Sequence, residues 1–111
     1  MEIEPSEKQI QQCCIYYLHL KHIFVKRLNV GGMINHKTGA YIFNPNTPRG
    51  LADLLVVVEG KAIFLEIKAR KGKQSDNQRL FEADAKQAGA EYHIIRSLEE
   101  LIELNLCKSK K

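Results

Sequence analysis

The stretch from Gly50 to Lys68, G-L-A-D-L-L-V-V-V-E-G-K-A-I-F-L-E-I-K, predicts two strands joined by a tight turn. Apolar residues dominate both halves, and the Glu59-Gly60 pair between them is typical of a two-residue hairpin turn. If this pair is the centre of the turn, Val58 faces Lys61 and the register of the whole hairpin follows.

This register brings three ionisable residues to one face of the hairpin. Asp53 lies directly opposite Glu66, with Cβ atoms about 4.5–5.5 Å apart, and Lys68 shares their face because side chains alternate along a strand. A loop of four residues keeps this arrangement, whereas a loop of three without a bulge breaks it. Two carboxylates so close together repel each other unless a cation lies between them. The arrangement suits Mg²⁺ beside a lysine, which indicates phosphodiester chemistry.

The apolar surroundings of these residues favour a functional interpretation. Charged residues at strand ends are more often solvated, and a cross-strand carboxylate next to a lysine is often a simple ion pair. Here the two strands are almost continuously hydrophobic, with Leu51, Leu54, Val56, Val58, Ile63, Leu65 and Ile67. Strands of this kind are covered on both faces, so three ionisable groups among them need a reason.

The length and composition indicate one folded domain over residues 1–111. Apolar residues make up 44% of the chain, and no apolar run reaches the roughly 18 residues of a membrane helix. The acidic N-terminus does not resemble a signal peptide, so we expect a cytoplasmic protein, bacterial or viral in its host cell, with no membrane partner. The three cysteines, Cys13, Cys14 and Cys107, form no disulfide framework or zinc signature.

The distribution of basic residues indicates a polyanionic partner. The net charge is +4, and the loop K-A-R-K-G-K directly after the carboxylate pair contains Lys68, Arg70, Lys71 and Lys73. A basic loop beside a metal site would attract phosphates, and Arg49 at the end of the preceding segment is a further candidate phosphate contact. The basic tail over residues 107–111 is expected to be disordered.

A capping box at Ser6 to Gln9 predicts a first helix that continues to about His22. Its predicted inner face consists of Ile10, Cys13, Cys14, Tyr17 and Leu18. Glu7 lies at the start of this face, where it either interacts favourably with the helix dipole or approaches the metal site. Residues 23–30 are expected to form a strand.

The region from Gly31 to Gly50 is irregular and predicts a loop or a small hairpin. Long irregular insertions beside a site often hold substrate. A second capping box at Ser75 to Gln78 predicts a helix that ends before Gly89. Gln78 shares a face with the apolar residues of that helix, so its side chain serves either the cap or the site. Residues 91–95 form the next predicted strand, and a third capping box at Ser97 begins a short closing helix.

The order helix, three strands, helix and strand resembles the common core of the PD-(D/E)xK nuclease superfamily. Asp53 and the Glu66-Ile67-Lys68 triplet fall where its D…ExK signature falls. More narrowly, residues 6–104 resemble a stand-alone virus-type replication-repair nuclease (VRR-NUC) domain. The segments that carry this resemblance are Glu7, R-G-L-A-D-L-L-V-V, F-L-E-I-K-A, S-D-N-Q-R-L-F and A-G-A-E-Y-H-I-I-R-S. One departure is Ala52, where the family often has a proline that is not a ligand.

The resemblance implies an α/β fold with an αβββαβ core, a central mixed sheet flanked by helices, and a short C-terminal helix. It also implies that Asp53, Glu66 and the backbone carbonyl of Ile67 bind Mg²⁺ or Mn²⁺, both of which prefer oxygen ligands. Lys68 would orient or deprotonate the attacking water, or neutralise the transition state.

Two further residues receive roles from the resemblance. Glu7 would hold a metal-bound water or a second ion, and Gln78 would orient Lys68 or the phosphate. The resemblance implies a metal-dependent endodeoxyribonuclease. Family members that stand alone at this length are similar to Holliday-junction resolvases, which implies a homodimer that acts on branched DNA. Candidate dimer surfaces are the Tyr41-Ile42-Phe43 run and the exposed side of the first helix.

Two alternatives stay open from the sequence. One is a nuclease of the same superfamily that acts on another DNA structure, such as a flap or a duplex end. The other is a non-catalytic DNA-binding module that keeps the fold, against which the intact Asp53, Glu66 and Lys68 argue.

Overall fold

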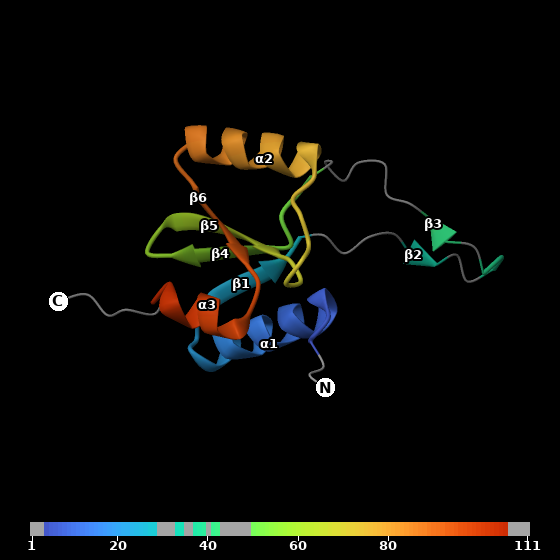
Figure 1. Ribbon diagram of the computed structural model, residues 1–111, viewed down its shortest axis with the longest axis horizontal. Helices are drawn as coiled ribbons and strands as arrows, with labels where there is room; N and C mark the ends of the chain where they lie inside the picture. The colour runs from blue at the N-terminus through green and yellow to red at the C-terminus, as the bar shows by residue number, and fades with distance from the viewer. Residues whose placement is uncertain (1–3, 29–32, 35–36, 40, 43–49, 107–111) are drawn as a thin grey trace.

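The computed structural model describes residues 4–28, 33–34, 37–39, 41–42 and 50–106. A mixed four-stranded sheet has the order β1-β4-β5-β6. The strands are β1 (Phe24–Arg27), β4 (Leu54–Val58), β5 (Lys61–Ile67) and β6 (Glu91–Ile95). β4 pairs antiparallel with β1 and with β5, and β6 pairs parallel with β5. Helix α2 (Asp76–Gln87) covers one face of the sheet, and α1 (Glu7–Leu20) and α3 (Leu98–Glu103) cover the other (Figure 1).

The β4–β5 hairpin has the predicted register. Val58 pairs with Lys61 at the turn, and the ladder continues to Leu54 opposite Leu65. The two turn residues, Glu59 and Gly60, have φ angles of 52° and 82°. A type I′ turn requires a positive φ at both central positions, so the local sequence fixes the register.

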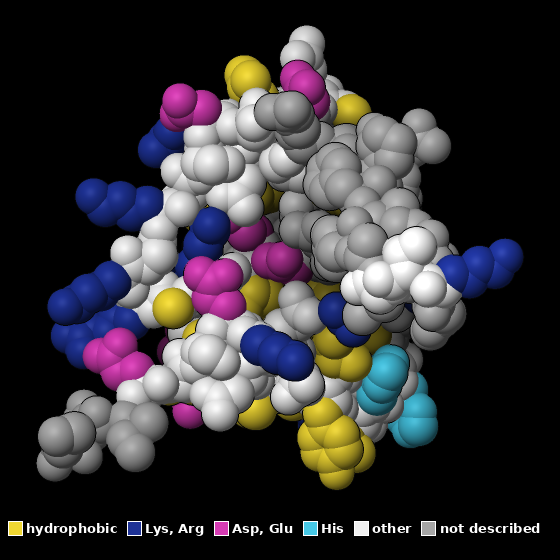
Figure 2. Space-filling model, turned by 90° about the vertical axis from the view of Figure 1, so that its right-hand side faces the viewer, with side chains coloured by type: hydrophobic (Ala, Val, Ile, Leu, Met, Phe, Trp, Pro, Cys, Tyr) yellow, Lys and Arg dark blue, Asp and Glu magenta, His cyan; other side chains and the backbone are white. Residues whose placement is uncertain are grey.

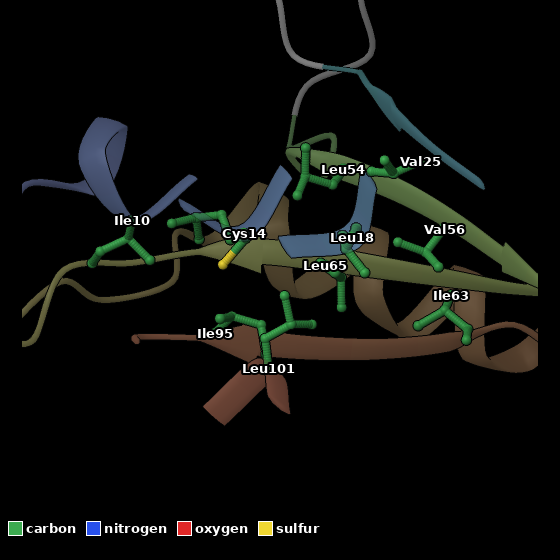
Figure 3. Close-up of a cluster of buried hydrophobic side chains, with 11 residues drawn as sticks. Ile10, Cys14, Leu18, Val25, Leu54, Val56, Ile63, Leu65, Ile95 and Leu101 are labelled. Carbon is green, nitrogen blue, oxygen red and sulfur yellow. The ribbon is translucent and has the colours of Figure 1, made fainter. Parts of the chain in front are cut away.

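The main core lies between the sheet and the α1/α3 layer. Alternate residues of the hairpin point into it, which buries Leu54 and Val56 of β4 and Leu65 of β5 completely. Figure 3 shows these side chains facing the apolar stripe of α1 and Leu101 of α3. The stripe consists of Ile10, Cys14 and Leu18.

The prediction for the inner face of α1 was wrong at Cys13, which is exposed. With about 100° between successive residues, the stripe formed by Ile10, Cys14 and Leu18 is centred on Cys14. Cys13 lies roughly 100° from that centre and faces solvent, whereas Tyr17 lies nearer to it and is half-buried.

The helices begin where the capping residues predicted. Ser6 and Gln9 form a reciprocal capping box at α1, and Ser75 and Gln78 form one at α2. α1 ends two residues earlier than expected, because His22 adopts a left-handed φ of 59°, which a right-handed helix cannot accommodate. Gly89 follows α2 with a φ of 99°, consistent with its predicted role as the residue after the C-cap.

At α3 only half of the predicted capping box forms. The Ser97 hydroxyl accepts the Glu100 amide, but the Glu100 carboxylate accepts the amide of Arg96 at 2.8 Å. The returning bond therefore reaches one residue further back than a capping box requires.

The irregular region contains a short antiparallel hairpin of β2 (Met33–Ile34) and β3 (Tyr41–Ile42), one of the two predicted alternatives. The predicted dimer contact Phe43, the predicted phosphate contact Arg49 and the basic tail over residues 107–111 lie outside the described residues. None of the described helices has the length and apolar character needed to cross a lipid bilayer.

Candidate active site

Asp53 is held at the point where β4 begins, next to both neighbouring strands. Its backbone carbonyl accepts the amide of Leu28, which follows β1, at 2.8 Å. Its side-chain Oδ2 accepts the amide of Ile67 at the end of β5 at 2.7 Å. The ladder pairs stop at Leu54, so the carboxylate takes over the hydrogen bond that the strand no longer supplies.

Glu66 is buried completely, and its two carboxylate oxygens have different surroundings. Oε1 accepts a hydrogen bond from the Tyr92 hydroxyl and a longer one, 3.4 Å, from Nε2 of Gln74. Oε2 has no hydrogen-bond partner among the described residues. A buried carboxylate oxygen without a donor is costly, so this atom marks a place where another group is expected.

Lys68 supplies the positive charge nearest to that oxygen. Its Nζ lies 3.4 Å from Glu66 Oε2, as an ion pair, and its side chain is 13% exposed. The Lys68 amide donates to the carbonyl of Ile95 on β6, so the parallel pairing with β6 continues one residue past β5 and fixes the lysine beside the carboxylates.

Glu7, in the first turn of α1, approaches the same end of the sheet. Its Oε2 accepts the amide of Ala69 at 3.3 Å, just after Lys68. A Cβ on Gly72 would lie 3.1 Å from the same oxygen, so a residue without a side chain leaves room for the carboxylate. Glu7 is exposed and also raises the pKa of Asp53.

The carboxylates influence one another's ionisation. Burial raises the pKa of Asp53 above its ordinary value, its hydrogen bond from Ile67 opposes this, Glu7 raises it further, and Lys68 and Arg27 lower it. Burial also raises the pKa of Glu66, whereas Lys68 lowers it and the charge of Asp53 raises it. A cation placed here would relieve all of these costs of the anionic forms.

The basic loop after β5 is folded back by Arg96. Nη1 of Arg96 donates to the carbonyls of Ala69 and Gly72, each at 2.8 Å, and to that of Arg70 at 3.3 Å. Arg70, a predicted DNA contact, forms an ion pair with Glu4 at 2.5 Å while its side chain stays 71% exposed.

The other predicted DNA contacts of the loop, Lys71 and Lys73, are exposed. Figure 2 looks onto the end of the sheet where β4 begins and β5 ends, and it shows acidic side chains near the middle of this surface with most of the Lys and Arg side chains at the left and others near the centre and at the right. Acidic and basic groups thus lie next to each other on one surface.

The two glutamines near the site have different contacts. Gln78, the predicted site residue, uses its Oε1 to accept the Ser75 amide at 2.8 Å and so completes the cap of α2. Gln74 is the glutamine that contacts Glu66, and its Nε2 also donates to Glu82 at 3.0 Å. Sequence reasoning missed Gln74 because it lies in an irregular segment with no periodic pattern.

Two more residues of the site were missed by sequence reasoning. Tyr92 contacts Glu66 because β6 pairs parallel with β5. No short turn joins these two strands, so the local sequence does not predict their pairing. Arg27 of β1 lowers the pKa of Asp53. In the antiparallel pairing of β1 with β4 it lies opposite Leu54, the residue after Asp53. Both positions depend on the order of strands in the sheet.

The donor set fits a hard divalent cation. Within the described part of the chain, no three His, Cys, Asp or Glu side chains form a metal-binding group, so two carboxylates must be complemented by a backbone oxygen. The Ile67 amide points to Asp53, and the amide and carbonyl of one strand residue face the same neighbouring strand. The Ile67 carbonyl is therefore directed to the Asp53 side, and all three donors are oxygens, as Mg²⁺ and Mn²⁺ prefer.

A groove of about 400 Å³ lies elsewhere, lined by Glu4, Pro5, Ile10, Arg70, Arg96, Ser97, Glu99 and Glu100. Neither carboxylate of the site nor Lys68 lines it. Its two arginines are paired with Glu4 and with backbone carbonyls, so it offers no unpaired cationic group to a ligand.

No protein-family model matches this chain, and no curated protein matches its sequence. The structural comparison found a solved structure described as "VRR_NUC domain", with a TM-score of 0.63 and 16% sequence identity. The match covers 91% of this chain and 96% of that chain. The mixed sheet, the flanking helices and the short C-terminal helix agree with the fold predicted from the sequence. The chain therefore has the α/β fold of a VRR-NUC domain, as its sequence resemblance predicted.

Proposed function

We propose that this protein is a metal-dependent endodeoxyribonuclease that hydrolyses phosphodiester bonds in branched DNA, such as four-way junctions, as a homodimer in the cytoplasm. The observation that carries the proposal is the completely buried Glu66, whose Oε2 lacks a hydrogen-bond donor and lies beside Lys68 and Asp53. The partner of that oxygen among the described residues is the Lys68 ammonium at 3.4 Å, and an oxygen with a single, long contact keeps a lone pair for a cation.

The described residues divide the chemistry between them. Asp53, Glu66 and the Ile67 carbonyl are the oxygen donors that would hold Mg²⁺ or Mn²⁺. When bound, such an ion polarises the phosphate and lowers the pKa of a coordinated water. Hydrolysis forms a bond between the water oxygen and phosphorus and breaks one P–O ester bond, and the departing oxygen takes up a proton.

Lys68 would stabilise the negative charge on the phosphoryl oxygens during this step. Its side chain is 13% exposed and its backbone is fixed by the bond to Ile95 of β6, and a charge held in place before the reaction is most effective in a transition state. Glu7 would hold a water or a second ion at the exposed edge of the site. Gln78, whose Oε1 is used in the cap of α2, is proposed to orient Lys68 or the phosphate.

The exposed basic residues give the proposal its DNA partner. Lys71 and Lys73 extend from the loop that Arg96 folds next to the site, and Arg70 and Arg49 are proposed to add phosphate contacts. Recognition of DNA structure is proposed over recognition of sequence, because phosphate contacts position a protein on DNA and carry no sequence information directly.

The proposed homodimer would place two active sites on two strands of a junction. A two-fold interface uses the same surface on both copies. Tyr16 and Leu20 on the outer side of α1 are 67% and 58% exposed, which supports this side of the helix as the contact surface. The other candidate dimer surface, the Tyr41-Ile42-Phe43 run, stays a prediction.

The decisive experiment is a cleavage assay on a four-way junction, a flap, a nicked duplex and a linear duplex of matched sequence. Cleavage of the junction by symmetric nicks in Mg²⁺, absent in chelator and lost in Asp53→Ala, is the expected result. Lys68→Ala should lose about 10²-fold or more in rate but keep most of its DNA affinity, because it is one charge among several.

Other outcomes of the same assay favour the other two candidates. Equal cleavage of flaps or duplex ends would support a superfamily nuclease with another substrate. DNA binding without metal-dependent cleavage of any substrate would support a non-catalytic binding module.

A further inference from the structure

Two residues outside the proposed ligand set determine how the Glu66 carboxylate is oriented. Both of its described hydrogen bonds, from Tyr92 and Gln74, are made to Oε1, and none is made to Oε2. A carboxylate whose oxygens were equivalent could rotate about its last bond. Here the donors on one oxygen select a single orientation and direct the other oxygen to Lys68.

The first donor, Tyr92, is itself fixed by its strand and by packing. It lies on β6, two residues from Ile94, the register partner of Glu66, and its side chain is 5% exposed. Its ring packs against Phe81 of α2, with centroids 6.1 Å apart. The hydroxyl therefore reaches Glu66 from a rigid position on the α2 face of the sheet.

The second donor, Gln74, joins the pair to a chain of polar groups. Its Nε2 lies 3.3 Å from the Tyr92 hydroxyl and 3.0 Å from Oε1 of Glu82. Glu82 in turn pairs with Lys86 at 2.6 Å, one turn later on α2. Chained hydrogen bonds strengthen one another in a medium of low polarity, so the orientation of Glu66 is supported by α2 as well as by β6.

We propose that Tyr92 and Gln74 are positioning residues that hold Glu66 with Oε2 directed into the metal site. This inference rests on the proposed function and adds to it the residues that set the affinity for the metal. Groups that hydrogen-bond to a metal ligand commonly change affinity by 10–100-fold when removed. Neither residue touches the DNA or the reacting phosphate in this assignment.

The test is calorimetric titration of the DNA-free protein with Mn²⁺. Tyr92→Phe, which removes only the hydroxyl, should weaken binding about 10-fold, and Gln74→Leu should weaken it in the same direction. Gln87→Leu is the matched control for Gln74→Leu, because Gln87 is exposed at the C-terminal end of α2; it should bind Mn²⁺ like the wild type. Wild-type affinity in Tyr92→Phe and in Gln74→Leu would overturn the proposal.

Cleavage kinetics separate positioning from a general loss of structure. Tyr92→Phe should raise the half-saturating Mg²⁺ concentration about 10-fold and recover most of its rate at high Mg²⁺. A lower melting temperature with an unchanged half-saturating concentration would show a purely structural role and reject the inference. If Tyr92→Phe does not fold, the same measurements are made on Gln74→Leu, which disturbs the core less because Gln74 is only partly buried.

Failure of the underlying function gives a different result. A wild-type protein that binds no Mn²⁺ and cleaves no DNA would reject the nuclease proposal, and the positioning roles with it. A wild-type protein that does both, with variants that titrate identically to it, would reject the positioning roles alone.

Discussion

Lys68→Met is the substitution that most directly tests whether the buried Glu66 depends on a nearby positive charge. Methionine keeps much of the apolar stem and removes the ammonium. The ammonium lies 3.4 Å from Glu66 Oε2, and the two side chains are 13% and 0% exposed. At this separation the Coulomb attraction is about 5 kcal/mol for an effective dielectric constant of 20.

The expected loss of stability is smaller than that attraction. Desolvation of the lysine offsets part of it, and removal of one partner from a buried pair typically costs about 3–5 kcal/mol. Glu66 can also take up a proton, which limits the cost of leaving it unpaired. We therefore expect about 3 kcal/mol at neutral pH, a large fraction of the 5–15 kcal/mol typical of a folded domain.

The pH dependence of this loss has a defined sign. Burial raises the pKa of Glu66 in the folded state, and Lys68 lowers it, so the variant has the higher folded-state pKa. In the window above the unfolded value of about 4.3, a folded state with the higher pKa binds protons more tightly and loses stability as the pH rises. The difference between variant and wild type should be small at pH 4 and should grow once the pH exceeds the folded-state pKa of Glu66 in the wild type.

Urea unfolding of the metal-free protein at several pH values measures this difference. In a double-mutant cycle with Glu66→Gln, the coupling energy should be about 2–3 kcal/mol. Lys61→Met is the matched control, because Lys61 lies on the same strand and forms a 4.0 Å pair with Glu91 in which both side chains are more than 40% exposed; it should cost less than about 1 kcal/mol. A coupling below about 0.5 kcal/mol, or a loss that does not change with pH, would refute the reasoning.

Three further predictions concern the site and its frame. Asp53→Asn should abolish Mn²⁺ binding and should stabilise the metal-free protein at pH 7, because the raised pKa of Asp53 makes its ionised form destabilising. The gain in the free energy of unfolding, measured in urea, should disappear below about pH 4. Gly50→Ala should destabilise by more than about 2 kcal/mol in thermal or urea unfolding, since its φ is +75° and a Cβ would lie 2.2 Å from the Asn77 carbonyl oxygen. Light scattering should give about twice the monomer mass of 12.7 kDa, and a monomer at micromolar concentration would reject the homodimer alone.

The parts of the fold that the sequence predicted are those set by local chemistry. Positive φ at Glu59 and Gly60 selects the turn, and the turn selects the register that brings Asp53 and Glu66 to the same end of β4 and β5. Ser6 and Ser75 begin helices because their hydroxyls satisfy free amides in the first turn. In each case the deciding contacts join residues close together in the sequence.

The parts that the sequence did not predict depend on contacts between distant segments. Tyr92 reaches Glu66 across 26 positions of sequence, and Arg96 reaches the Ala69 carbonyl across 27. Both contacts require the parallel β5–β6 pairing, whose register is set by the packing of α2 and not by a turn. For Gln78 the helical spacing left the cap and the site open; its Oε1 is used in the cap, and its role at the site stays a prediction.

The arrangement of the sheet explains why the ionisable groups collect at one end. β4 begins and β5 ends at the same end of the sheet. Because β6 runs parallel to β5, the loop after β5 and the loop after β6 both leave the sheet at that end. Glu7 reaches it from the N-terminus of α1. The strands that bury Glu66 also leave the Lys68 side chain only 13% exposed, which strengthens the charge interactions at the site and raises the cost of removing either partner of the pair.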